Sequence, residues 1–173
     1  MKLFFAIWPD QSTKIRLDGL AKLLHRACGG KITKSESIHL TLVFIGEVEA
    51  SERLRMAASS LSGKPFEMNF DKVAYWKHNR IAWAGMGIVP DGLKDLVDSL
   101  KAALKTEGYR FDERSYVPHV TLLRHAREPE ILPQSEPFIW HVAEFCLVAS
   151  TDSGYRILET WPLEKDASFE MPG

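Results

Sequence analysis

The stretch IHLTLVFIG, residues 38–46, is an apolar run interrupted by His39 and Thr41. Side chains two residues apart on a β-strand point to the same face. The run therefore predicts a buried strand, about Ile38 to Phe44, that presents an imidazole and a hydroxyl side by side. A lone histidine near a strand end is more often structural than catalytic, and threonine is a good strand former. This motif alone identifies no site.

The stretch PHVTLLR, residues 118–124, repeats the arrangement at His119 and Thr121. His119 follows His39 by 80 residues, and other landmarks recur at nearly the same offset. These landmarks are the Pro-Asp pairs at 9–10 and 90–91, which are 81 apart, and Leu20 and Leu100, which are 80 apart. In each half a strand, a Pro-Asp pair, an amphipathic helix, a loop and a His-x-Thr strand follow in that order. The repeat indicates two structurally similar lobes.

Amphipathic periodicity predicts helices at about 11–26, 51–61 and 89–108. Asp10 or Ser12 is expected to cap the first helix, and Asp91 to cap the third, which stops at Gly108. The expected apolar stripe of the first helix is Ile15, Leu17, Leu20, Leu23 and Leu24. That of the third helix is Leu93, Leu96, Val97, Leu100 and Leu104.

Further strands are expected at about Lys2 to Trp8, 66–76, 80–86, 138–142, 144–150 and 155–161. A pseudo-twofold axis between the lobes would place the two His-x-Thr strands on opposite walls of a central groove. We therefore expect an α+β fold with two pseudo-symmetric lobes, antiparallel sheets lining the groove and helices outside. Since no low-complexity linker separates the halves, residues 1–173 are expected to form a single bilobal domain with a mobile tail from about residue 165.

The composition is that of an ordinary globular protein, 45% apolar and 26% charged. A net charge of −1 argues against a broad grip on long nucleic acid but leaves room for a local basic groove. Cys28 and Cys146 lack metal-site spacing and are expected to be reduced thiols. The apolar run from Leu3 to Trp8 is shorter than the core of a signal peptide, and no stretch approaches the ~20 apolar residues of a membrane span. We expect a cytoplasmic protein without membrane contact, and a monomer.

Two facing His-Thr pairs suit displacement at phosphorus. In-line attack puts the nucleophile and the leaving oxygen on opposite sides of the phosphorus, so a base is needed on one side and an acid on the other. Histidine serves either role because its pKa of ~6.5 lies near working pH. Each threonine hydroxyl, only ~6.6 Å along the strand, can bind a phosphate oxygen. Arg124, at the end of the second strand, could add a charge-assisted contact.

The segments LFFAIWPD (3–10), IHLTLVFIG, PHVTLLR and GYRILETWPL (154–163) resemble the two-histidine phosphoesterases, and among them the bacterial RNA 2′,3′-cyclic phosphodiesterases, historically called RNA 2′,5′-ligases. The resemblance implies a metal-free and cofactor-free groove that hydrolyses an RNA 2′,3′-cyclic phosphate end to a 2′-phosphomonoester, with reversible 2′,5′ ligation as a related activity. It implies that His39 donates a proton to the leaving 3′ oxygen and that His119 accepts one from water. It also implies phosphate binding by Thr41, Thr121 and Arg124.

Other functions remain open at this point. A metal site built on His39 and His119 would lack carboxylate or cysteine companions at nearby spacing. A non-catalytic module that binds an RNA end or a nucleotide would not need two histidines of opposite protonation. Within the enzyme class, the substrate could be another cyclic phosphate or a 2′,5′-linked oligonucleotide.

Several other side chains are weaker candidates. The histidines without a repeat partner are expected to be structural or exposed, namely His25, His78, His125 and His141. Aromatic residues that could stack a base are Phe4, Phe5, Trp83 and Tyr116, although aromatics on strands are usually core. Candidates for a basic groove rim are Lys77, Arg80, Arg110, Arg114 and Arg127, although most of them are expected to lie on a solvated surface.

Overall fold

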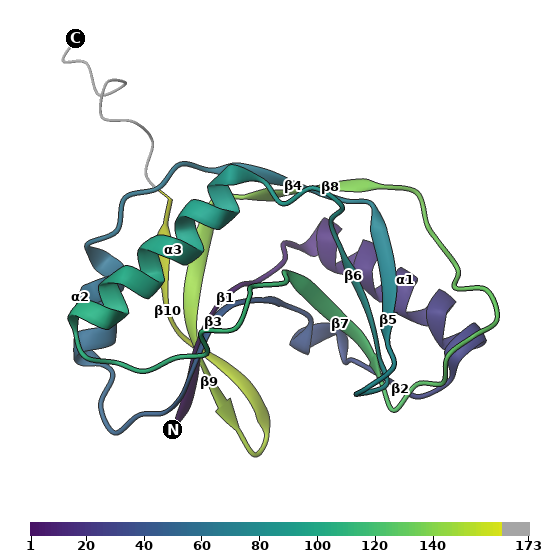
Figure 1. Cartoon of the computed structure of the whole chain (residues 1–173), viewed down its shortest axis with the longest axis horizontal. Coiled ribbons are helices and arrows are strands. Elements are labelled where there is room, and N and C mark those ends of the chain that lie inside the picture. The colour runs from purple at the N-terminus through teal and green to yellow at the C-terminus, as the bar shows by residue number, and fades with distance from the viewer. Residues whose placement is uncertain (164–173) are drawn as a thin grey trace, which may run out of the picture.

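Two four-stranded antiparallel sheets form the two lobes of the protein in the computed structural model, which describes residues 1–163 (Figure 1). The first sheet has the order β10-β9-β1-β3, built from β1 (Lys2–Ile7), β3 (Leu40–Glu47), β9 (Glu144–Thr151) and β10 (Gly154–Pro162). The second has the order β2-β7-β6-β5, built from β2 (Lys31–Ile32), β5 (Lys72–Trp76), β6 (Ile81–Gly85) and β7 (His119–Arg124). A ribbon of β4 (Phe66–Phe70) and β8 (Phe138–Val142) lies between the lobes, along the upper edge of the molecule in Figure 1.

The helices cover the outer faces of the sheets, but each long helix crosses to the lobe opposite its preceding strand. Helix α1 (Gln11–Cys28) follows β1 of the first sheet and packs against β6 and β7 of the second. Helix α3 (Asp91–Thr106) follows β6 of the second sheet and packs against β3 of the first, together with α2 (Glu52–Ser59). A short 3-10 turn, Ser35–Ser37, precedes β3. The expected α+β fold with two similar lobes is confirmed, and the lobes are interlocked.

The helix starts are related by symmetry, but their caps differ. The Asp10 side chain caps α1 by accepting a hydrogen bond of 2.8 Å from the Thr13 amide. The prediction that Asp91 caps α3 is wrong, because the N-cap is Pro90 and Asp91 is the first helical residue. The Pro-Asp pair is therefore shifted by one position relative to the helix start, which accounts for its offset of 81 rather than 80. An aspartate in the first turn still interacts favourably with the helix dipole.

The predicted apolar stripe agrees with the observed burial better in α3 than in α1. All five residues predicted for α3 are buried. In α1 the prediction is wrong at Ile15 and Leu23, which are 63% and 37% exposed, whereas Ala21 and Cys28 are buried. Helix α1 packs on its sheet with Ala21 and Cys28 at one side of the buried stripe. Ile15 and Leu23 therefore lie outside the contact with the sheet. Hydrophobic residues are not confined to the interior, and isolated ones on a surface are common.

The segment 66–76, expected as one strand, forms β4 in the bridging ribbon and β5 in the second sheet. Asp71 separates the two strands, and its carboxylate accepts a hydrogen bond of 2.8 Å from the Gly87 amide. A side chain that binds the backbone of a distant loop lets the chain leave one sheet and enter another.

The His-x-Thr strands face the space between the lobes with one side only. On β3 the alternate residues Leu40 and Leu42 are 0% and 2% exposed, and on β7 Val120 and Leu122 are both 0% exposed. The pleat therefore directs the intervening histidine and threonine side chains away from the core.

Among residues 1–163, no helix is long and apolar enough to cross a membrane. The tail expected to be mobile from about residue 165 lies outside the described residues.

Neighbouring leucines on α1 provide a test of this packing. Leu24 is fully buried and Leu23 is 37% exposed. Leu24→Ala is expected to lower the free energy of unfolding by about 2–5 kcal/mol, since it leaves a cavity in a close-packed core. Leu23→Ala should change it far less, by about 0.5 kcal/mol. Urea denaturation followed by circular dichroism measures both, and similar losses would contradict the assigned helix orientation.

Candidate active site

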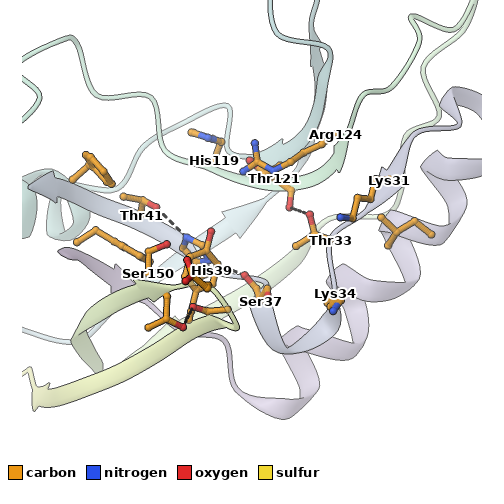
Figure 2. A pocket seen from close by; sticks show the side chains of 17 residues that line it. Lys31, Thr33, Lys34, Ser37, His39, Thr41, His119, Thr121, Arg124 and Ser150 are labelled. Atoms are coloured by element: carbon orange, nitrogen blue, oxygen red, sulfur yellow. Dashed lines mark hydrogen bonds between the residues drawn. The ribbon is translucent and has the colours of Figure 1, made fainter. Parts of the chain in front are cut away.

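A cavity of about 490 Å³ opens between the two sheets and contains all five residues of the predicted site. His39 and Thr41 enter it from one wall, and His119, Thr121 and Arg124 from the opposite wall (Figure 2). The other lining residues come from the β2 region, from β1 and β3, and from the β9–β10 hairpin: Lys31, Ile32, Thr33, Lys34, Ser37, Phe4, Phe44, Ser150, Thr151, Asp152, Gly154 and Tyr155.

Each histidine is oriented by a carbonyl two residues earlier in the chain. His39 Nδ1 lies 2.8 Å from the Ser37 carbonyl oxygen, and His119 Nδ1 lies 2.8 Å from the Val117 carbonyl oxygen. A carbonyl only accepts hydrogen bonds, so Nδ1 carries the proton in both rings. Nε2 is then left without a proton in the neutral ring and can accept one from a ligand.

His39 differs from His119 in a second contact. His39 Nε2 lies 3.2 Å from the Thr41 hydroxyl, so the pair on β3 is coupled before any ligand binds. His39 itself directly precedes β3, whose first residue is Leu40, whereas His119 is the first residue of β7.

Aromatic rings fix the planes of both imidazoles. Trp8 stacks on His39 with ring centroids 4.9 Å apart and planes inclined by 7°. Phe4 and Tyr155 contact the same imidazole at 5.1 and 5.0 Å. Trp76 meets His119 edge to face at 4.6 Å. The face of an indole also attracts a cation, so Trp8 can stabilise a protonated ring at His39.

The electrostatics of the cavity keep both imidazoles neutral near pH 7. Burial lowers the pKa of His39 below its ordinary value, and charge on His119 or Arg124 lowers it further. Burial lowers the pKa of His119 in the same way, and Arg124 adds to the effect. The hydrogen bonds to backbone carbonyls oppose these shifts, since they stabilise the protonated ring, but the net direction is downward.

One hydrogen bond joins the two walls of the cavity, and a second supports the β7 wall from the β2 side. The hydroxyl of Tyr116, just before β7, donates to the Thr41 carbonyl on β3 at 2.9 Å. Burial raises the pKa of Tyr116, so this hydroxyl keeps its proton and remains a donor. The Thr33 hydroxyl donates to the Thr121 carbonyl at 2.9 Å. Each threonine of the two motifs is therefore fixed through its backbone by a residue from another segment.

The weaker candidates from the sequence are mostly elsewhere. Of the four aromatics, only Phe4 lines the cavity. Phe5 is in the core, Trp83 packs behind His119, and Tyr116 ties β7 to β3. The four histidines that have no counterpart in the repeat are exposed and lie outside the cavity.

None of the five candidates for a basic rim lines the cavity, and all five are exposed, as was expected for most of them. Arg80 donates to the Ala126 carbonyl, and Arg114 pairs with Asp112. The lining cations are Arg124, Lys31 and Lys34. Sequence reasoning missed both lysines because a two-residue strand such as β2 has no periodicity. It also missed Tyr155, although the quoted segment 154–163 contains it.

Residues 1–163 contain no group of three or more histidine, cysteine, aspartate or glutamate side chains placed to hold a metal ion.

Two antiparallel lobes that bring two His-x-Thr strands to one cavity define a two-histidine phosphoesterase. The family model described as LigT like Phosphoesterase matches residues 7–83. The RNA 2′,3′-cyclic phosphodiesterase of Escherichia coli K12 is 33% identical, over 94% of this chain and 96% of that relative. The enzyme of the same name from Archaeoglobus fulgidus is 31% identical over 76% and 77%. This chain belongs to the LigT-like phosphoesterases.

A solved structure supports the same assignment. E. coli LigT complexed with 3′-AMP superposes with a TM-score of 0.86 at 29% identity, covering 95% of this chain and 98% of that one. The similarity extends over both lobes, including the strands that carry the two histidines.

The protonation of the site can be measured directly. Both site histidines are expected to titrate below the ordinary pKa of ~6.5, and to show the Nδ1–H tautomer when neutral. Arg124→Gln should raise the pKa of both, since removing a nearby positive charge makes protonation easier. Long-range ¹H–¹⁵N NMR spectra over a pH series report both properties. A neutral Nε2–H tautomer at either ring would contradict the assigned hydrogen bonds.

Proposed function

We propose that this protein hydrolyses RNA 2′,3′-cyclic phosphate ends to 2′-phosphomonoesters, with His39 and His119 as acid and base and without a metal ion or other cofactor. The observation that carries the proposal is the pair of imidazoles from opposite walls of one cavity, each anchored at Nδ1. The relatives named RNA 2′,3′-cyclic phosphodiesterase support the reaction class.

The proposed reaction is a single in-line displacement. His119 Nε2 accepts a proton from water as the water oxygen bonds to phosphorus. The bond between phosphorus and the 3′ oxygen breaks on the opposite side, and His39 Nε2 gives its proton to that oxygen. The products are a 2′-phosphomonoester and a free 3′-hydroxyl. A 5′-hydroxyl in place of water would give a 2′,5′ linkage by the same proton transfers.

Substrate binding supplies the charge state that this step needs. A general acid must enter protonated, whereas both free imidazoles have lowered pKa values. The anionic phosphodiester favours the charged form of a nearby imidazole and offsets the charge of Arg124. We assign the proton to His39, as the resemblance to the two-histidine phosphoesterases implies, and the stacked face of Trp8 can stabilise an imidazolium there.

The remaining predicted residues hold the phosphate. The Thr41 and Thr121 hydroxyls can donate to non-bridging oxygens from opposite walls. The Thr41 hydroxyl must exchange its contact with His39 Nε2 for one with the substrate. The Arg124 guanidinium adds a charge-assisted hydrogen bond.

The proposal also includes the cellular compartment and the oligomeric state of the enzyme. Cys28 and Cys146 are both buried and unpaired, which fits a reducing compartment such as the cytoplasm. We propose a monomer in which one bilobal domain holds the whole site.

Product analysis without metal ions tests the reaction. In EDTA, the protein is expected to convert adenosine 2′,3′-cyclic phosphate to adenosine 2′-phosphate, resolved from the 3′ isomer by chromatography. A His39→Ala/His119→Ala double variant, purified identically, controls for contaminating nucleases. Activity lost in EDTA and restored by zinc would favour the metal-site alternative. Binding without turnover would favour a non-catalytic module.

Single substitutions test the assigned roles. His39→Ala and His119→Ala should each lower kcat/KM by about 10²–10⁴-fold and abolish one limb of a bell-shaped pH profile. Thr41→Val and Thr121→Val should cost roughly ten- to a hundred-fold and keep both limbs, since each removes a hydrogen bond to a charged group but no proton carrier. Near-normal turnover by both folded histidine variants would show that the mechanism is wrong.

A further inference from the structure

The cavity is longer than a single phosphate requires, and its two ends differ in charge. Figure 2 shows Ser150 on one side of His39, and Lys31 and Lys34 on the other. The Ser150 end belongs to the β9–β10 hairpin and contains the carboxylate of Asp152. The opposite end is formed by β2 and the loop that follows it. A ligand with more than one phosphate therefore meets attraction at one end and repulsion at the other.

Lys31 and Arg124 are directly opposite each other in the antiparallel pair of β2 and β7. Both side chains line the cavity, so they are on the same side of this edge. Like charges directly opposite on a sheet destabilise it. Among residues 1–163, no carboxylate forms an ion pair with Lys31, Lys34 or Arg124. The repulsion between these cations is left for an anionic ligand to relieve.

The segment 31–34, which carries both lysines, is attached to β7 by hydrogen bonds from Thr33. The Thr33 amide donates to the Leu122 carbonyl, and its hydroxyl donates to the Thr121 carbonyl, both at 2.9 Å. Just before this segment, Gly30 has a φ of +81°, and a Cβ there would approach the Arg124 carbonyl to 2.5 Å. Glycine permits this close contact. The lysines consequently have a fixed base, although their side chains are exposed.

We propose that Lys31 and Lys34 form a second phosphate subsite, which binds the 5′-phosphate of the nucleotide that carries the cyclic phosphate. The inference rests on the proposed function and assigns a second phosphate of its RNA substrate to named residues. Arg124 ends β7 directly opposite Lys31, and Figure 2 shows both lysines on the side of the cavity away from Thr41 and His119. We therefore assign the lysines to the neighbouring phosphate, with Arg124 between them and the reacting one.

The charge pattern also sets the direction of the RNA. Its 5′ continuation leaves over β2, where the cations are, and the terminal nucleoside faces the hairpin that carries Tyr155 and Asp152. A mononucleoside 2′,3′-cyclic phosphate fills only the catalytic part of the cavity.

Two substrates that differ by a single phosphate test this subsite. Adenosine 2′,3′-cyclic phosphate and its 5′-phosphorylated form are compared by kcat/KM in low-salt buffer with EDTA. The wild-type protein is expected to prefer the 5′-phosphorylated substrate. Lys31→Ala and Lys34→Ala should each reduce this preference roughly two- to fivefold, as befits exposed ion pairs. Each should also weaken the salt dependence measured with the 5′-phosphorylated substrate, because one salt-screened charge contact is removed.

Matched controls make the result decisive. Lys31→Arg should retain the preference because it keeps the charge, and Lys94→Ala, on the exposed side of α3, should leave the ratio unchanged. No wild-type preference, or equal losses on both substrates in the lysine variants, would overturn the subsite while leaving the proposed hydrolysis intact. Turnover of neither substrate by the wild-type protein would overturn the proposed function itself.

Discussion

The period-two alternation of β3 and β7 is the constraint on which the site depends. Each strand must seal the core with one face and offer reactive groups with the other. Leu40 and Leu42 do the first on β3, and Val120 and Leu122 do it on β7. A shift of either strand by one residue would bury polar groups and expose leucines, so packing of the core fixes the register of both strands. The same packing therefore directs the two imidazoles into the cavity.

Positioning by the strands does not by itself make one of two similar histidines an acid and the other a base. The anchoring carbonyls treat both rings alike, and burial lowers the pKa of each. Their neighbours differ, because Trp8 stacks on His39 while Trp76 meets His119 edge to face. The resting site is a pair of neutral imidazoles near the cation Arg124. In the mechanism proposed above, the anionic substrate completes the charge state of the working site.

The features that could be predicted from the sequence are those that follow from the local spacing of side chains. Both His-x-Thr strands, the α3 stripe and the 80-residue repeat follow from side-chain spacing, and they were enough to place the five predicted residues in one cavity. Features set by distant partners could not be derived in this way. Ile15 is exposed because of where α1 meets the opposite lobe, and the chain turns at Asp71 because of a hydrogen bond to Gly87. Lys31 reaches the cavity only because β2 pairs with β7.

The exchange of helices between lobes determines what half of this chain could do by itself. Helix α1 packs on the sheet of β6 and β7, and α3 packs against β3. A half-length chain, with one His-x-Thr strand and one helix, would leave its apolar stripe uncovered unless an identical chain supplied the opposite sheet. Such a half would be an obligate twofold homodimer, with two equivalent histidines related by the symmetry axis. Joining the halves in one chain removes that equivalence, which the proposed division of the two imidazoles into proton donor and proton acceptor requires.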